Sequence, residues 1–133
     1  MSDMQPALLT RIDSVTQELL GKKLRLAGEV LAYDATTALV ILRARARDGG
    51  EGWAGVLVDV SDCVSQWSKP WLRERFCKVT TVGYLERAAD TRLPEMPPHV
   101  RLPGVLDCGL VVRALLVSSA RDLTMETWDE AIG

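Results

Sequence analysis

Three arginines in one stretch of the chain have the clearest potential for chemistry. Arg43, Arg45 and Arg47 occupy every second position, so on a β-strand their side chains point to the same face. A row of guanidinium groups on such a face can track phosphates and stack on nucleic-acid bases. The alternative is that this face is simply the solvent side of a half-buried strand, which is polar by construction.

The supply of aromatic residues limits a nucleic-acid hypothesis. Proteins that bind single strands without sequence preference usually present several stacking rings, and only Trp53 is expected near the arginine face. Trp67, Trp71 and Trp128 are expected in the core or in an interface. Further candidates for nucleic-acid contact are arginines at the start of, or inside, a long later connection: Arg87, Arg92 and Arg101.

Catalysis has little support in the sequence. His99 is the only histidine and lies among prolines, without an adjacent base, nucleophile or metal ligand, which indicates a solvated loop residue. Gly49, Gly50 and Gly52 lack the Lys-Ser or Lys-Thr continuation of a phosphate-binding loop and predict a hairpin turn instead. We therefore expect a protein that is not an enzyme, with no metal and no cofactor.

The cysteines and aspartates also favour structural roles. Cys63, Cys77 and Cys108 are odd in number and scattered, which fits neither a zinc site nor the disulfide framework of a secreted protein. Their apolar neighbours predict buried, reduced thiols in an intracellular protein. Asp59 and Asp62 are expected to be solvated at the end of a strand.

Composition predicts one packed domain. The chain has 133 residues, of which 47% are hydrophobic and 26% charged, with a formal net charge of −2. One core suffices for this length, and a net charge near zero means that any nucleic-acid contact must come from a local patch. Charged residues spread through residues 1–20 argue against a membrane span or a signal peptide.

Period-two alternation and β-favouring residues predict five strands. These run over Lys22 to Asp34, Leu39 to Arg47, Trp53 to Val60, Cys77 to Glu86, and Cys108 to Ser119. Gly28, inside the first strand, suits a bend where a small barrel curls on itself. Between the third and fourth strands, Ser68 and Pro70 predict the start of one short helix.

Two further segments carry expectations of their own. Four prolines lie in the long connection from Arg87 to Asp107, and we expect the part from Arg92 to Pro103 to be mobile and shortened at little cost in stability. After Ser119, Thr124 can cap a terminal helix. Its apolar stripe predicts a partner interface, with packing on the barrel itself as the alternative: Leu123, Met125, Trp128, Ala131 and Ile132.

The order of these elements predicts an all-β protein, a five-stranded Greek-key barrel of the OB fold with a short helix between strands three and four and a C-terminal α-helix. A different small β-barrel is the alternative. We expect an N-terminal extension or helix over residues 1–20, the OB barrel over 21–122 and a partner-binding helix over 123–133.

Three groups of residues recur in the order and spacing of a known family. The first is Gly21, Leu24, Arg25, Gly28, Val30, Tyr33, Asp34, Val40 and Leu42; the second is Val82, Gly83 and Leu85; the third is Val111, Val112, Arg113, Ala114, Leu123, Thr124, Met125, Trp128, Ala131 and Ile132. Together they resemble the small Ten-one subunit of the telomeric CST complex. The smallest subunit of replication protein A is the nearest alternative.

This resemblance implies a non-catalytic subunit that forms a heterodimer with a larger OB-fold protein, the Stn-one subunit. It implies a nuclear location at chromosome telomeres, a third large subunit of the Ctc-one or Cdc-thirteen type, and contact with telomeric single-stranded DNA mainly through the complex. It also implies support for recruiting DNA polymerase alpha-primase, and no membrane. The alternatives are a replication protein A-like subunit, an independent single-strand-binding module, or an OB domain that binds only protein.

Overall fold

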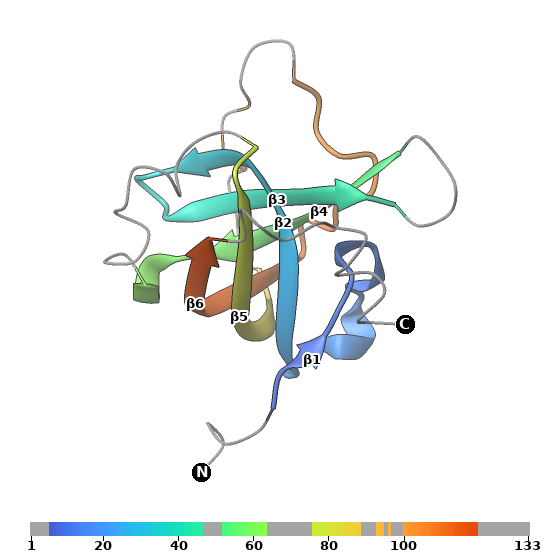
Figure 1. Ribbon diagram of the computed structural model, residues 1–133, viewed down its shortest axis with the longest axis vertical. Helices are drawn as coiled ribbons and strands as arrows, with labels where there is room; N and C mark the ends of the chain where they lie inside the picture. Colours follow the sequence, from blue (N-terminus) through green and yellow to red (C-terminus); the bar gives the residue numbers. More distant parts are fainter. Residues whose placement is uncertain are drawn as a thin grey trace.

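The protein forms a mixed β-sheet of six strands that closes into a barrel (Figure 1). The computed structural model describes residues 6–46, 52–63, 76–88, 93–94, 96 and 100–119. Its strands are β1 (Leu8–Leu9), β2 (Lys23–Asp34), β3 (Leu39–Arg45), β4 (Trp53–Asp59), β5 (Lys78–Arg87) and β6 (Leu110–Ser119). Three short 3-10 turns accompany them: η2 (Ile12–Ser14), η3 (Gln17–Leu19) and η4 (Ser61–Cys63). The five predicted strands are confirmed within one or two residues at each described end.

The barrel closes because β2 pairs with two strands in turn. Residues Lys23–Glu29 pair with β5, and Glu29–Asp34 pair with β3. The remaining order is β3, β4, β6, β5, in which only the β4–β6 contact of the barrel is parallel. In Figure 1, β2 and β5 cross β3 and β4 at a steep angle. The closed ring contains β2, β3, β4, β6 and β5, while β1 pairs only with β2 and lies outside the ring. The prediction of a five-stranded barrel is confirmed.

Gly28 sits where β2 passes from β5 to β3. A Cβ atom at this position would lie 2.6 Å from Cδ1 of Ile12 and 2.9 Å from the backbone oxygen of Arg43, so the close approach requires glycine. Ile12 is buried against this point. Nearby, β1 pairs in parallel with β2, and the Thr10 N–H donates to the Arg25 carbonyl at 3.0 Å. Part of the predicted N-terminal extension is therefore attached to the barrel.

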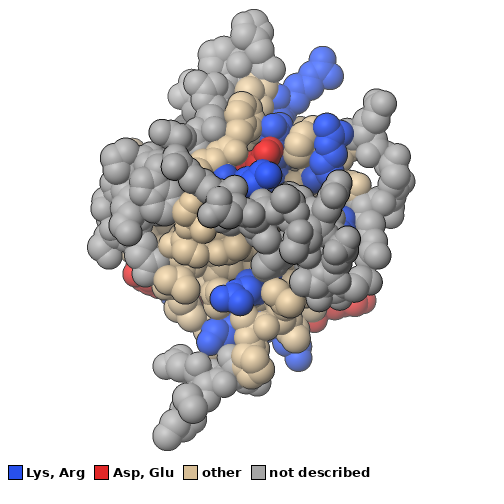
Figure 2. Space-filling model, in the orientation of Figure 1, with Lys and Arg blue, Asp and Glu red and all other residues tan. Residues whose placement is uncertain are grey.

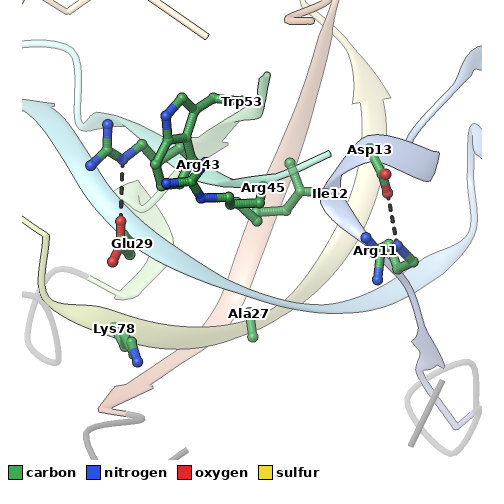
Figure 3. Close-up of a pocket in the computed structure, with 10 residues that line it drawn as sticks. Arg11, Ile12, Asp13, Ala27, Glu29, Arg43, Arg45, Trp53 and Lys78 are labelled. Carbon is green, nitrogen blue, oxygen red and sulfur yellow. Dashed lines mark hydrogen bonds and ion pairs between the residues drawn. The ribbon is translucent and has the colours of Figure 1, made fainter. Parts of the chain in front are cut away.

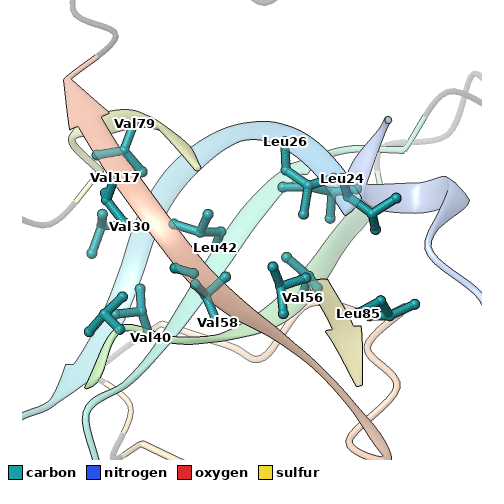
Figure 4. Close-up of a cluster of buried hydrophobic side chains, with 14 of the residues drawn as sticks. Leu24, Leu26, Val30, Val40, Leu42, Val56, Val58, Val79, Leu85 and Val117 are labelled. Atoms are coloured by element: carbon teal, nitrogen blue, oxygen red, sulfur yellow. The ribbon is translucent and has the colours of Figure 1, made fainter. Parts of the chain in front are cut away.

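The inner core fills the barrel with aliphatic side chains (Figure 4). Every second residue of β3 and β4 contributes, since successive side chains of a strand alternate between faces. The core residues include Leu24, Leu26, Val30, Val40, Leu42, Val56, Val58, Val79, Leu85 and Val117. Fully burying one such side chain stabilises the fold by about 1.5–3 kcal/mol.

A second apolar cluster lies on the outside of the barrel, and we call it the outer cluster. Leu31, Ile41 and Leu57 are 0% exposed although they alternate with inner-core residues. The side chains packed over them are partly buried and come mainly from the Pro-rich connection: Leu93, Met96, Val100, Leu106 and Val111. Both faces of the strands are therefore buried at this point.

The Pro-rich connection is also held to β4 by its backbone. The Gly55 N–H donates to the Val105 carbonyl at 2.8 Å, and the Val105 N–H donates to the Trp53 carbonyl at 3.2 Å. Pro103 packs so closely on Gly55 that a Cβ there would lie 2.7 Å from the Pro103 Cγ. The described residues of the connection therefore pack on the barrel, and the mobility of residues 92–103 and the small cost of shortening them stay predictions.

The cysteines differ from one another in burial. Cys63 is buried, Cys77 is half-buried and Cys108 is exposed. The prediction of burial is wrong for Cys108, because it lies in a tight turn in which Asp107 Oδ1 accepts the Gly109 N–H at 2.8 Å. Burial, with a smaller contribution from the nearby carboxylates of Asp62 and Asp59, raises the pKa of the Cys63 thiol to about 11.

The two predicted helices, one with Ser68 and Pro70 near its start and one at the C-terminus, lie outside the described residues. Within the described part of the chain, no helix is long and apolar enough to cross a membrane. The same part contains no group of three or more His, Cys, Asp or Glu side chains that could hold a metal ion.

Candidate functional site

Arg43 and Arg45 lie on the outer face of the barrel, as their alternation predicts. Cross-strand pairing places Arg45 opposite Trp53 and Arg43 opposite Gly55. The Trp53 ring centroid is 3.9 Å from Cζ of Arg43 and 4.6 Å from Cζ of Arg45. Both guanidinium groups therefore make cation–π contacts with one indole ring.

Phe76 supplies a second ring to the same group of residues. Its ring centroid is 4.5 Å from Cζ of Arg43, so Arg43 contacts two aromatic side chains. Phe76 has a φ of 63°, a left-handed conformation that is unusual for a bulky residue. Its N–H donates to the Val30 carbonyl at 2.6 Å, which holds the residue on β2 despite a strain of about 1–3 kcal/mol. Phe76 was not among the site residues predicted from the sequence.

Glu29 fixes the position of Arg43. Arg43 Nε donates to Glu29 Oε1 at 3.2 Å, with side-chain exposures of 17% and 25% (Figure 3). The Arg43 guanidinium is held by this carboxylate and by two rings. Its main role is therefore to position the neighbouring side chains, because its charge is already paired. We call Glu29, Arg43, Arg45, Trp53 and Phe76 the Arg43 cluster.

Two hollows flank the Arg43 cluster. The smaller, of about 210 Å³, is lined by Arg11, Ile12, Asp13, Ala27, Glu29, Arg43, Ala44, Arg45, Trp53 and Lys78 (Figure 3). The larger and more open one, of about 630 Å³, is lined by Arg43, Gly52, Trp53, Phe76, Val100, Arg101, Leu102 and Gly104. Arg43 and Trp53 belong to both, so the two hollows meet at the cluster.

The charge around the hollows is mainly positive. Lining cations are Arg11, Arg43, Arg45, Lys78 and Arg101, whereas the lining acids are Asp13 and Glu29. Each acid already pairs with an arginine: Asp13 with Arg11 at 3.0 Å, and Glu29 with Arg43. Figure 2 shows several Lys and Arg side chains on the upper half of one face, with little acid among them. The site therefore favours an anionic ligand.

The remaining predicted site residues do not all join this cluster. Arg101 lines the larger hollow. Arg87 lies at the other end of β5 from Lys78, about 30 Å of extended strand away, and lines neither hollow. Other predicted contacts lie outside the described residues: Arg47 and Arg92, and the stripe Leu123, Met125, Trp128, Ala131 and Ile132. Lys78 and Arg11 also line the smaller hollow, and neither was predicted from the sequence.

The position of the cluster matches the class of fold. OB barrels bind nucleic acids on the face corresponding to β3 and β4 here, beside the loop corresponding to the Pro-rich connection. The hollows at the open end of this face are lined by guanidinium groups, by the ammonium group of Lys78 from β5 and by the rings of Trp53 and Phe76. Such groups suit contacts with phosphates and bases. Fold and face together define an OB-fold domain with a basic, aromatic patch.

Solved structures show the same fold. A chain of the S. pombe Stn1–Ten1 complex superposes with a TM-score of 0.61 and 19% identity, covering 97% of this chain and 90% of that one. The S. pombe telomere capping protein Ten1 gives a TM-score of 0.59 and 20% identity, over 96% and 94% of the two chains. An OBody bound to hen egg-white lysozyme gives 0.54 and 19%, over 85% and 94%. No protein-family profile and no curated protein matches the sequence.

Proposed function

We propose that this chain is a non-catalytic OB-fold subunit that pairs with a larger OB-fold protein in a nuclear complex that protects telomeric single-stranded DNA. In this role it corresponds to Ten1 in a CST complex, stabilises a Stn1-type partner and supports recruitment of DNA polymerase alpha-primase by the complex. A third large subunit completes the assembly. The observation that carries the proposal is the structural match to Ten1 and to a chain of the Stn1–Ten1 complex, over nearly the whole length of both proteins in each pair.

An exposed apolar surface on β6 gives physical support for a partner. Leu115 and Leu116 are 42% and 44% exposed, although they are neighbours on one strand. The β5–β6 register shifts at Val82/Gly83, which breaks the alternation that would bury one of them. A Cβ at Gly83 would lie 2.2 Å from the Arg113 backbone oxygen, so glycine is needed for this irregularity. Two adjacent leucines exposed to water are typical of a surface that a partner protein covers.

Co-purification with the larger OB-fold subunit from the same organism tests the proposal. Leu115→Ser combined with Leu116→Ser should abolish or strongly weaken pairing while the free chain keeps its circular dichroism spectrum. Trp128→Ala should weaken pairing by about 2 kcal/mol or more, as loss of an interface anchor does. Leu102→Ser is the matched control, since Leu102 is also 44% exposed but lines the larger hollow. Wild-type chain that never pairs would contradict the proposal.

A second function is favoured by the Arg43 cluster: direct binding of single-stranded nucleic acid by the chain alone. Two rings and a surplus of cations on the OB binding face support it. Titration of labelled oligothymidylate at two salt concentrations tests it, because phosphate contacts weaken as salt rises. Absence of binding at low salt by the wild-type chain would contradict this function and leave the partner-binding function intact.

A further inference from the structure

The outer face of β3 and β4 is divided into a covered part and an open part. Ile41 and Leu57, which pair across the two strands, are 0% exposed beneath the Pro-rich connection. Two residues further along each strand, the next pair on the outer face is Arg43 and Gly55, and Pro103 packs on Gly55. Arg45 and Trp53 follow; Arg45 lines the smaller hollow, and Trp53 lines both. A ligand that binds this face can therefore contact only the open part, which carries Arg43, Arg45 and Trp53.

From this division we propose that the chain binds a short stretch of single-stranded nucleic acid, of fewer than about four nucleotides, the lower end of the OB range, across the Arg43 cluster from one hollow to the other. OB folds generally occupy about 4–16 nucleotides, so this site is shorter than usual. The inference rests on the second function proposed above. It adds the length of the ligand and the residues that contact it.

The described side chains have three different roles in the proposed site: base stacking, phosphate contact and positioning. Phe76 is 42% exposed and lines the larger hollow, so its ring offers a stacking surface for one base. Arg101 in the larger hollow, and Arg45 and Lys78 in the smaller, are cations with no acidic partner among the described residues, and they are available for phosphates. Trp53, Arg43 and Glu29 are positioning residues that hold the junction between the hollows.

The connection limits the length because its contacts close the rest of the face. Backbone hydrogen bonds that join Val105 to Gly55 and Trp53 anchor the connection to β4 beside the open part. Beyond Arg43, the apolar side chains of the connection cover Leu31, Ile41 and Leu57. A strand that continued past Arg43 would have to displace these contacts. The described residues of the outer cluster and of its cover are apolar, and none of them is a cation that could bind a phosphate.

A length series of fluorescently labelled oligothymidylates, from two to twelve nucleotides, tests the proposal on the full chain at low salt. We expect affinity to stop rising steeply at or below about four nucleotides, the lower end of the OB range, and then to grow only with the number of equivalent positions on the oligonucleotide. Affinity that keeps rising steeply to ten or more nucleotides would overturn the short site. No binding at any length would overturn both the short site and the DNA-binding function beneath it.

Single substitutions locate the contacts. Arg45→Ala, Lys78→Ala and Arg101→Ala should each lower the slope of log affinity against log salt by about 0.7, the value for one phosphate contact on a single strand. Phe76→Ala should weaken binding about ten-fold, the scale of one base–aromatic contact. Arg25→Ala is the matched control, because Arg25 is an exposed cation on β2 that lines neither hollow. Equal effects of Arg25→Ala and the three site variants would contradict the proposed location.

The role of the connection needs its own variant. Leu93→Ser combined with Met96→Ser removes two side chains that cover the outer cluster, and we expect the length at which affinity levels off to increase. A thermal melt verifies that the variant is folded, and if it is not, Met96→Ser alone is used. An unchanged limit in the folded variant would show that the connection does not set the length.

Discussion

The two ends of the outer β3–β4 face have the same backbone geometry and opposite chemistry. At one end, Ile41 and Leu57 are fully buried by the protein's own connection. At the other end, Arg45 and Trp53 line open hollows. The strands that carry both ends are continuous and regularly paired. Binding capacity on this barrel is therefore decided by what covers the sheet.

The difference has an energetic side. The covered end contributes buried apolar area and so stabilises the fold, whereas the open end holds cations and a strained Phe76 that contribute little to folding. Stability and ligand binding should thus respond to different substitutions on the same two strands.

The largest expected effect is at the covered end. Leu57→Ala, and separately Ile41→Ala, should lower the free energy of unfolding by about 2–4 kcal/mol, because each leaves a cavity beneath the connection. Arg45→Ala, on the same face, should change it by no more than about 0.5 kcal/mol. Urea denaturation of the three variants measures the contrast, and equal losses at both ends would refute it.

A smaller effect is expected where the connection meets β4. Gly55→Ala places a Cβ 2.7 Å from the Pro103 Cγ, and since the proline ring cannot yield by rotation, we expect a loss of about 1–2 kcal/mol. Gly52→Ala is the control, because a Cβ at Gly52 has no neighbour within 4 Å. Thermal melts compare the two, and a neutral Gly55→Ala would show that the contact between Pro103 and β4 is easily given up.

At the open end, Glu29→Gln should cost no more than about 1 kcal/mol, because the pair with Arg43 is only partly buried. The cost should shrink at high salt as screening weakens the pair in the wild type. The same variant removes a negative charge beside the hollows and should strengthen anion binding. A large, salt-independent loss of stability would mean that Glu29 supports the fold by other contacts.

The last effect is expected only at alkaline pH and concerns the inner core, which belongs to neither end. The thiol of Cys63 has a pKa raised by burial from 9.0 to about 11, so the unfolded chain loses this proton at lower pH than the folded chain. The contribution of Cys63 to stability is therefore complete below about pH 9 and is lost as pH rises towards 11. Denaturation of wild type and Cys63→Val between pH 8 and pH 10.5 should show a steeper fall for wild type. Parallel curves would refute this.

The strands were predictable because alternating apolar residues depend only on local geometry. The outer cluster had a visible signal that was not used: Val30, Leu31 and Ala32, and likewise Leu39 to Leu42, are continuous apolar runs. Such runs indicate strands buried on both faces. The prolines of the later connection were read as chain breakers, whereas the leucine, methionine and valine residues between them supply the cover.

The site was predicted only in part. Arg43, Arg45 and Trp53 share a face because alternation requires it, but the partners of Arg43 come from elsewhere in the chain. Glu29 is supplied by β2, and Phe76 reaches the cluster through a left-handed backbone conformation. Such contacts depend on tertiary packing, which periodicity in a single sequence does not specify.

The parallel contact between β4 and β6 has a consequence for biosynthesis. Pairing of Leu57 with Val111 joins segments that are far apart in the chain, and β6 also supplies the partner of β5. During translation the edges of β4 and β5 therefore stay unpaired until β6 has left the ribosome. Unpaired strand edges promote aggregation, and contacts between distant segments slow folding. A nascent chain of this protein thus depends on its last described strand to hide the earlier ones.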